Sequence, residues 1–439
     1  MIRYTQGVAR CVALALLSCP AVAFATNGYF MHGYGNLSKG MAGVAYALPQ
    51  DALAPASNPA GLTLLNDRID LGLDWIGPRR SASIDGNRQL TLRSADGDFS
   101  GDRLRSFFVP ELGYRRQLGE SLSFGLALYG NGGLNTDYAD NPYAGFGSTG
   151  RAGVDLAQLF VSPALAWQIN ERNSIGVAVN AVLQRFKAYG LDAFSTTVFP
   201  GPYSETPDRM TNQGYDSSFG ISYRLGWLVE PVEALTFGLS WQPKTRMMKF
   251  DKYRGLFPDQ GSFDIPENYG AGAAYRWRNT LIFAADVQVI RYDRVRSLGT
   301  PVQPLHDGAL LGSDDGPGFG WASMTVKKLG LGWQATPYLR LNSGYSWGNQ
   351  PVRAGQTLFN ILAPAVVEQH YAVGASYRYN SRVDINVYYC KGPTNTLRGQ
   401  NSIPPNRLSS PLPPESLGGG EADIRLSGES AGLSMAYRF

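Results

Sequence analysis

Cysteine is almost missing from the part of the chain that would function outside the cell. The sequence contains 3 cysteines, and two of them, Cys11 and Cys19, lie in a segment that has the features of a signal peptide. A positively charged start, an apolar stretch and the A-x-A site at residues 23–25 predict that residues 1–25 are a signal peptide. Cys390 then remains alone, which excludes an intramolecular disulfide, so other forces must hold the exported protein together.

Long apolar runs are also missing. After residue 25 no stretch approaches the roughly 18 apolar residues that a membrane helix needs, and the mean hydropathy is −0.19. A strong charge of either sign is missing too: without Arg3 and Arg10 of the signal peptide, the 39 basic residues become 37 against 35 acidic residues. This balance gives no support to nucleic-acid binding, and we expect no nucleic-acid partner.

Histidine is scarce, which limits the enzyme and metal chemistry that the chain could support. The 3 histidines are His32, His306 and His370, and they stand far apart in the sequence. No cysteine or carboxylate cluster has the spacing of metal ligands. We therefore expect no metal site, no cofactor and no enzymatic activity.

What the chain does contain is glycine, tyrosine and alternating strands. It has 52 Gly and 24 Tyr, and aromatic residues make up 12%. In one segment Leu235, Phe237, Leu239 and Trp241 alternate with small or polar residues, which is the period-2 pattern of a half-buried strand. Lipid-facing and lumen-facing residues alternate in an outer-membrane barrel, so the average hydropathy stays mild although every strand has an apolar face.

Short and long connections between these segments alternate, as periplasmic turns and extracellular loops do in outer-membrane barrels. The count predicts an all-β fold, a transmembrane antiparallel barrel of about fourteen strands. We expect the C-terminal strand, which ends at Phe439, to close the barrel against residues 68–76. The predicted strands are 68–76, 104–117, 121–131, 155–168, 174–187, 215–229, 234–247, 267–278, 280–292, 322–334, 338–348, 368–379, 382–391 and 429–439.

A barrel of this size has a lumen wider than the side chains of its own wall can fill. Residues 26–65 precede the first strand, are rich in Gly and Ala, and show no clean strand alternation. We expect residues 26–65 to form a hatch, or plug, inside a barrel made of residues 66–439.

The same N-terminal segment carries a resemblance. It contains Lys39-Gly40, Ala42-Gly43 and above all Asn58-Pro59-Ala60-Gly61-Leu62, and it resembles the hatch of the FadL family of outer-membrane transporters for long-chain fatty acids and hydrocarbons. One stretch departs from the resemblance: residues 360–368 stand where the fatty-acid branch of the family has an acidic Pro-Asp element. The resemblance therefore implies the fold but leaves the substrate open.

The resemblance also implies a route. Asn58, Pro59 and Ala60 would be the hatch motif, although an Asn-Pro pair is also an ordinary turn. Members of the family place this motif against a kinked third strand, where ligand leaves sideways into the membrane. The corresponding strand is 121–131, where Gly125 and Gly130 are the candidates for a kink; glycine could equally serve a crowded lumen face.

Two sets of residues are candidates for contact with ligand. The apolar residues of the hatch could line a binding pocket, or they could pack the plug against the wall. They are Tyr29, Phe30, Met31, Tyr34, Met41 and Leu48. Side-chain parity places a second set, of charged residues, inside the lumen, where a salt-bridged network that braces the plug is favoured over a clamp for a carboxylate. These are Arg115, Arg224, Arg276, Arg340, Arg378, Arg438, Glu111, Asp286 and Asp384.

These observations predict a monomer in the outer membrane of a Gram-negative bacterium that takes up hydrophobic small molecules passively and releases them sideways into the membrane. Long-chain fatty acids are the leading cargo. Aromatic or aliphatic hydrocarbons are an alternative, and a structural or adhesive barrel is another; export by the same route stays open. The expected partners are outer-membrane lipid and lipopolysaccharide, and the assembly machinery that inserts outer-membrane barrels.

Overall fold

The computed structural model describes residues 27–87, 94–195, 202–278, 280–403 and 419–439. The predicted signal peptide, residues 1–25, lies outside the described residues. In the described parts of the chain, no helix is both long enough and apolar enough to span a membrane.

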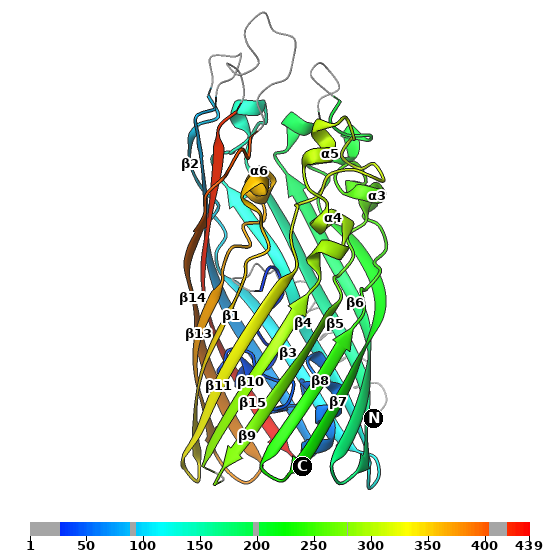
Figure 1. The fold of residues 1–439 in the computed structure, drawn as a ribbon, viewed down its shortest axis with the longest axis vertical. Helices are drawn as coiled ribbons and strands as arrows, with labels where there is room; N and C mark the ends of the chain where they lie inside the picture. Colours follow the sequence, from blue (N-terminus) through cyan, green and yellow to red (C-terminus); the bar gives the residue numbers. More distant parts are fainter. Residues whose placement is uncertain (1–26, 88–93, 196–201, 279, 404–418) are drawn as a thin grey trace, which may run out of the picture.

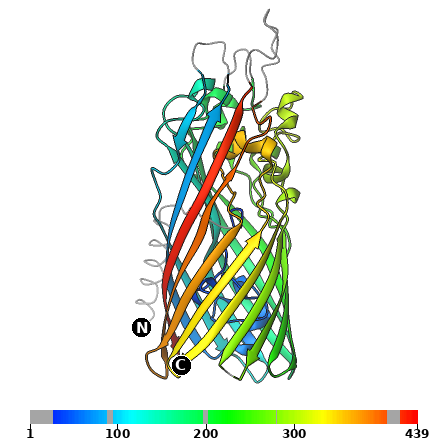
Figure 2. The same ribbon diagram turned by 60° about the vertical axis from the view of Figure 1, so that its left-hand side comes forward.

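The described strands form one 15-stranded antiparallel sheet that closes on itself (Figures 1 and 2). The short strand β2 (Gly97–Ser100) pairs only with β1, so the closed ring contains the other fourteen. The prediction of an all-β barrel of about fourteen strands is confirmed. The ring consists of β1 (Arg68–Asp85), β3 (Phe107–Gln117), β4 (Leu122–Tyr138), β5 (Ala152–Asn170), β6 (Asn173–Tyr189), β7 (Asp216–Val232), β8 (Leu235–Gln242), β9 (Asn268–Trp277), β10 (Leu281–Ile290), β11 (Met324–Thr336), β12 (Leu339–Gly348), β13 (Gln369–Arg378), β14 (Val383–Leu397) and β15 (Glu421–Arg438).

The first and last strands of the ring pair with each other as predicted. Arg68 lies opposite Arg438, and the pairing continues without a shift to Asp85 opposite Glu421. Both strands are longer than predicted at the end that carries the long loops, because their alternation there uses Ser, Arg and Asp on the outer face in place of large apolar residues. The predicted end of the first strand at residue 76 is therefore wrong.

The outer wall is apolar where the sequence alternates. Leu239, Phe283 and Leu331 expose 48%, 47% and 38% of their surface, whereas their neighbours Gly238, Ala284 and Gly332 turn inward. Small inward residues matter because the inner segment lies close to the wall: a Cβ on Gly238 would come within 1.9 Å of the Tyr46 carbonyl oxygen.

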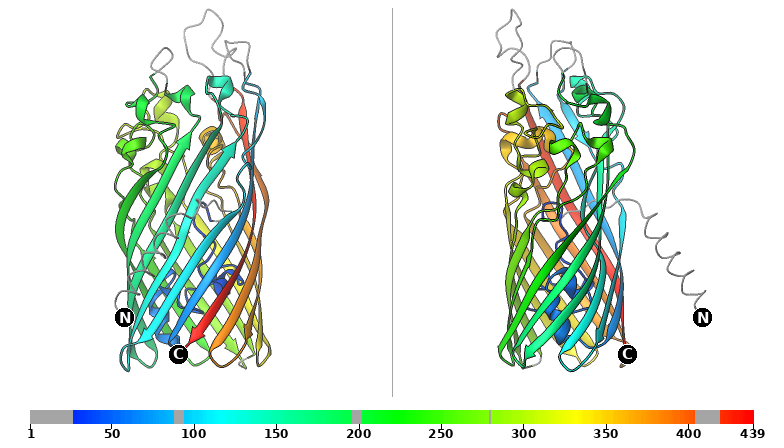
Figure 3. Two further views of the ribbon diagram at one scale, coloured as in Figure 1. Left: turned by 180° about the vertical axis from the view of Figure 1, so that it is seen from behind. Right: turned by 90° about the vertical axis from the view of Figure 1, so that its right-hand side faces the viewer.

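Residues 27–65, which we call the inner segment, lie inside the barrel near the end that carries the short turns (Figures 1 and 3). The segment contains α2 (Asn36–Lys39), η1 (Ala54–Ala56) and η2 (Pro59–Leu64), joined by turns. Most of its residues are buried. It fills the lumen beside the lower halves of the strands.

The long loops fold over the opposite end of the barrel. Their short helices are η3 (Ala144–Phe146), η4 (Asp192–Phe194), η5 (Pro207–Arg209), η6 (Asp251–Tyr253), α3 (Pro258–Gly261), η7 (Tyr292–Arg294), α4 (Arg296–Gly299), α5 (Gln303–His306), η8 (Ala354–Gln356) and α6 (Thr357–Asn360). The segment after α6 turns into the barrel mouth, where the Tyr138 hydroxyl donates to the Ile361 carbonyl oxygen at 2.8 Å.

Candidate transport path and lateral exit

Strands β3 and β4 are neighbours in the wall of the barrel, but among the described residues they pair along only part of their length. These strands pair from Gln117 opposite Ser123 up to Leu112 opposite Leu128, and no further pair joins them. Beyond these pairs, the described partners on this edge of β4 are Phe30, which bridges to Gly132, and Asp102, which bridges to Asp137. We call the region between residues 107–111 of β3 and residues 129–136 of β4 the β3–β4 break.

A bulge in β4 lies beside this break. In the pairing with β5, Gly130 lies opposite Leu159 and Gly132 lies opposite Gln158, so Asn131 is an extra residue. A bulge bends its strand and redirects the side chains that follow. The predicted end of this strand at residue 131 is wrong, since β4 continues to Tyr138. The alternation breaks at the bulge and resumes after it with the inward and outward positions exchanged.

The two glycines that were candidates for the kink have different surroundings. Gly130 adjoins the bulge, and a Cβ there would come within 2.9 Å of Val109 on β3. Gly125 lies in regular pairing with both neighbouring strands, so the prediction of a kink at Gly125 is wrong. Its missing side chain instead makes room for Leu62, which a Cβ would approach to 2.7 Å.

The start of the inner segment occupies the free edge of β4. The Met31 amide donates to the Asn131 carbonyl oxygen at 3.0 Å, and the Gly133 amide donates to the Tyr29 carbonyl oxygen at 3.0 Å. Phe30 thereby forms an antiparallel bridge with Gly132. A Cβ on Gly132 would lie only 1.9 Å from the Tyr29 carbonyl oxygen, so this contact requires glycine.

Arg80 connects β4 to the segment before β3, at the end of the β3–β4 break that is nearer the long loops. This buried side chain of β1 donates to the carbonyl oxygen and the side-chain oxygen of Asn135, at 2.6 and 2.9 Å, and to the Leu104 carbonyl oxygen. Its Nε lies 3.5 Å from the Asp102 carboxylate. The sequence analysis missed Arg80 because it lies beyond the predicted end of the first strand.

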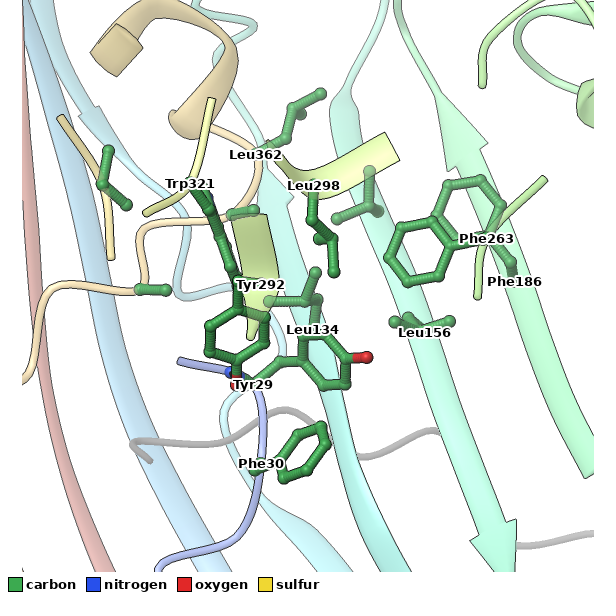
Figure 4. Close-up of a cluster of buried hydrophobic side chains, with 14 of the residues drawn as sticks. Tyr29, Phe30, Leu134, Leu156, Phe186, Phe263, Tyr292, Leu298, Trp321 and Leu362 are labelled. Atoms are coloured by element: carbon green, nitrogen blue, oxygen red, sulfur yellow. The ribbon is translucent and has the colours of Figure 1, made fainter. Parts of the chain in front are cut away.

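An aromatic cluster surrounds Tyr29 and Phe30 (Figure 4). The rings of Tyr292 and Trp321, which come from the long loops, lie 5.5 and 6.2 Å from the Tyr29 ring, and the Tyr292 ring lies 5.9 Å from that of Phe30. The Tyr292 hydroxyl also donates to the Asn27 carbonyl oxygen at 2.5 Å. Four of the six candidate ligand residues, Tyr29, Phe30, Met31 and Tyr34, belong to this buried region.

An apolar cavity continues from this cluster toward the long loops. Its free volume is about 50 Å³, which is smaller than the few hundred Å³ of typical ligand pockets, so a ligand would have to displace side chains to enter. None of the described residues that line it carries a charge. They are Tyr143, Val154, Phe186, Leu191, Phe194, Met210, Leu256, Phe257, Ser297, Leu311, Pro317, Gly318, Phe319, Phe359 and Leu362.

The other two candidate ligand residues lie elsewhere. Met41 and Leu48 form a separate cluster with Val44 and Ala47, packed against Ala274 and Ala284 of the wall. These residues lie where the inner segment packs against strands β9 and β10. The structure therefore does not bring them together with Tyr29 and Phe30.

A buried ion cluster connects the inner segment to β1 and β3. The Lys39 ammonium contacts carboxylate oxygens of Asp74 and Glu111, and all three side chains are at most 1% exposed. Burial acts to lower the pKa of Lys39, but the charges of Asp74 and Glu111 outweigh it and raise that pKa above the ordinary value. Lys39 is therefore charged. The alternation of inward and outward positions in the first predicted strand could have identified Asp74, because it lies on the same face as Arg68 and Asp70.

Two further groups of the wall bond to the backbone of the inner segment. The Asp286 carboxylate accepts hydrogen bonds from the Ala45 and Tyr46 amides, at 2.7 and 3.1 Å. The Lys328 ammonium, which the sequence analysis missed, donates to the His32 and Gly43 carbonyl oxygens at 3.0 and 3.1 Å. Such charge-assisted bonds are stronger than neutral ones.

The remaining predicted lumen charges divide into two sets. Arg115, Arg224 and Arg340 donate to Leu62, Ser57 and Gln50 of the inner segment. The others pair with groups of the wall near the short turns: Arg276 with Glu230, and both Arg378 and Arg438 with Asp384.

The Asn58-Pro59-Ala60 motif joins the inner segment to itself and to β7. The Asn58 side-chain oxygen accepts from the Ala60 amide at 3.2 Å and thereby caps η2. Its amide donates to the carbonyl oxygens of Tyr46 and Trp227, at 2.7 and 3.2 Å. Gly176 and Gly226 of the wall leave the space that the motif occupies.

Comparison with known proteins agrees with this architecture. The model of a family described as outer membrane protein transport protein (OMPP1/FadL/TodX) matches residues 12–439. The long-chain fatty acid transport protein of Escherichia coli O6:H1 strain CFT073 is 28% identical over 312 residues, 65% of this chain and 65% of that protein. That of Escherichia coli K12 is 27% identical over 206 residues, 46% and 43% of the two chains. The chain thus spans less than two thirds of either relative.

Solved structures resemble the chain over nearly its whole length. The toluene transporter TodX of Pseudomonas putida has a TM-score of 0.66 at 17% identity, covering 94% of this chain and 100% of that chain. A FadL homologue of Pseudomonas aeruginosa has a TM-score of 0.68 at 14% identity, with the same coverage. At such low identity the likeness establishes the fold.

Proposed function

Since the chain belongs to the outer membrane protein transport protein family (OMPP1/FadL/TodX), we propose that it takes up hydrophobic compounds passively across the outer membrane and releases them sideways into the bilayer. The observation that carries the proposal is the β3–β4 break with the start of the inner segment bonded to its free edge. A break in the wall beside a buried apolar cluster gives an apolar molecule a path out of the barrel.

The proposed route starts in the apolar cavity under the long loops, passes the aromatic cluster at Tyr29 and Phe30, and ends at the β3–β4 break. The free energy of an apolar molecule falls by about 0.8 kcal/mol for each methylene that leaves water, whether for the cavity or for the bilayer. Transfer from water to the bilayer is therefore favourable without ATP. The inner segment would act as the hatch, and its displacement at residues 29–31 would open the exit.

Long-chain fatty acids are the leading cargo, and the named Escherichia coli relatives transport them. A specific observation favours the alternative of uncharged hydrocarbons: the described residues that line the apolar cavity include no lysine, arginine or histidine. A buried carboxylate without a partner is costly. Hydrocarbons lack this cost, so we retain them as the second candidate.

A disulfide across the break tests the proposal. A Cβ on Gly130 would lie 2.9 Å from the Val109 Cγ1, which puts the two Cβ atoms within the roughly 3.5–4.5 Å that a disulfide requires. The variant Val109→Cys/Gly130→Cys should lose uptake of radiolabelled oleate or toluene when oxidised and regain it with a reductant.

The control is Tyr114→Cys/Leu126→Cys, a directly opposed pair in the regular part of the same two strands. This crosslink should leave uptake unchanged, because it does not span the break. Full uptake in the oxidised Val109/Gly130 variant would refute a lateral exit. If neither substrate is taken up even by the wild-type protein while cells retain surface adhesion, the adhesive alternative gains support.

A further inference from the structure

A group of basic and aromatic side chains lies on the outside of the barrel, where β5, β6 and β7 approach the long loops. On β6, Val177 and Val179 are exposed on the lipid face, and Arg185 and Lys187 continue the same face at alternate positions. Arg185 lies opposite Ser217, one outward position beyond Phe219, which exposes 44% of its surface. The basic residues thus begin where the apolar belt ends.

Tyr215 holds these cations in place. Its hydroxyl donates to the Asp155 carboxylate of β5 at 2.8 Å, so the ring reaches across β6. The Arg185 guanidinium carbon lies 4.4 Å from the centre of this ring, and the Lys187 ammonium lies 4.7 Å from it. Lys187 also lies 5.1 Å from the Tyr189 ring, and Arg151 lies 5.9 Å from it. Cation–π contacts of this kind restrict long flexible side chains.

The charge of the group is predominantly positive on its accessible side. Lys252 adds a further cation, with its ammonium donating to the Tyr215 carbonyl oxygen at 2.7 Å. Asp155 is only 3% exposed and accepts the tyrosine hydroxyl, and Asp216 accepts from the Ser217 and Lys252 amides. Asp137 lies 3.6 Å from Arg151 but is shared with Arg103. Asp155 is thus inaccessible from outside, whereas Arg151 is exposed and Arg185, Lys187 and Lys252 are partly exposed.

We infer that Arg151, Arg185, Lys187 and Lys252, arranged on Tyr189 and Tyr215, form a binding site for the phosphate groups of a glycolipid in the outer leaflet. On β6 and β7 the group begins where the exposed apolar residues end, on the side of the long loops, which is where lipid headgroups are expected. Arginine binds phosphate with paired hydrogen bonds and lysine binds it as a point charge. Two cations fixed on one ring have already lost much of the side-chain entropy that binding would cost.

A purely structural reading is that the cations only cover the aromatic rings. That reading predicts no dependence on lipid phosphate, so binding decides between the two. The experiment uses the mature chain in detergent and measures lipid A association by native mass spectrometry. Substitution Arg185→Gln/Lys187→Gln should weaken binding of bisphosphorylated lipid A by about tenfold or more, as expected for the loss of two charge-assisted contacts.

The matched control is Arg79→Gln/Arg425→Gln, which removes two exposed basic residues from the outer faces of β1 and β15, away from the aromatic group. It should bind lipid A like the wild type. Lipid A with both phosphates removed should bind all variants equally weakly. Heat-modified migration on gels verifies that each variant is folded.

Equal affinity of the Arg185/Lys187 variant and the control would overturn the inference, as would full affinity for dephosphorylated lipid A. Displacement of lipid A by inorganic phosphate at equal concentration would also overturn it, because the site would then recognise free phosphate and not the lipid. The variant Arg185→Lys keeps the positive charge and should retain most of the binding. If substitutions at this position acted through misfolding, keeping the charge would not restore the binding.

Discussion

The ammonium group of Lys39 lies 2.5 Å from a carboxylate oxygen of Glu111, and neither side chain is more than 1% exposed. Lys39 belongs to the inner segment and Glu111 to the wall, next to the β3–β4 break. Because Asp74 contacts the same ammonium, one cation is shared by two buried carboxyl groups. This cluster therefore determines how firmly the inner segment is seated.

Replacing Lys39 by methionine should unseat the inner segment. Removal of one partner of a buried ion pair typically costs about 3–5 kcal/mol, because a charge is left uncompensated. Without the inner segment the lumen is open, so the variant should conduct ions in planar bilayers. The control Lys327→Met removes an exposed lysine of β11 and should not conduct. If Asp74→Asn and Glu111→Gln are added to Lys39→Met, conductance should fall again; persistence of the full conductance would contradict this account.

Asn58→Ala should loosen the inner segment to a smaller extent. The side chain makes hydrogen bonds to Ala60, Tyr46 and Trp227, and their loss should cost about 1–3 kcal/mol. Hydrogen exchange of the amides in η2 should accelerate, while that of the wall should not change. The substitution Asn380→Ala, in an exposed short turn, is the control. Unchanged exchange in η2 would mean that the motif has no part in holding this segment.

The carboxyl group of Asp51 should make the stability of the inner segment inside the barrel depend on pH. Burial, followed by the negative charge of Asp70, raises the pKa of this carboxyl to about 7, while in an unfolded chain it is about 4. The folded state therefore retains a proton that the unfolded state releases, so the stabilisation is present below about pH 4 and is lost as the pH rises to 7.

The measurement is hydrogen exchange at residues 51–54 at pH 5.5 and pH 8, corrected for the intrinsic rate. Protection should be lower at pH 8 in the wild type and equal at the two pH values in Asp51→Asn. Asp140→Asn, in an exposed loop, should behave like the wild type. A wild type whose protection rises with pH would show that the sign is wrong.

Much of the barrel follows from sequence because its wall repeats one simple rule. Alternation with a period of two fixes which face of each strand meets lipid, and it also placed Arg115, Glu111 and Asp286 inside the lumen. The pairing of the first strand with the last follows from the need to close the ring, whereas the register that places Arg68 opposite Arg438 comes from the structure. Strand ends were less predictable, since near the long loops the outer face meets water and its residues lose their apolar character.

The candidate exit was harder to predict, because it depends on contacts between distant segments. Glycine at position 130 is compatible with a kink or with a crowded neighbour, and only the pairing with β5 shows that the extra residue is Asn131. Tyr292 was expected at the end of a strand, 280–292, but β10 ends at Ile290, and Trp321 lies just before the predicted strand 322–334, so no local pattern connects either with Tyr29. Arg80 lay beyond the expected strand and could not be placed.

The hydroxyl of Tyr292 should control how readily the start of the inner segment leaves the β3–β4 break. It donates to the Asn27 carbonyl oxygen and accepts from the Tyr29 amide, at 2.5 and 3.2 Å. Tyr292→Phe keeps the ring in the aromatic cluster but removes both bonds, and leaving these buried groups without partners should cost about 1–3 kcal/mol.

Exchange of the Tyr29 and Met31 amides should therefore accelerate in Tyr292→Phe, and uptake of a radiolabelled hydrophobic substrate should become faster if opening of this segment limits transport. Tyr253→Phe is the control, since its hydroxyl donates to the carbonyl oxygens of Gly214 in a loop and Ala188 in β6 and has no bond to the inner segment among those described. Faster exchange without faster uptake would place the limiting step at the apolar cavity, where a ligand must first displace side chains. Identical exchange in both variants would show that the pairing of Phe30 with Gly132 holds the segment without help from the loop.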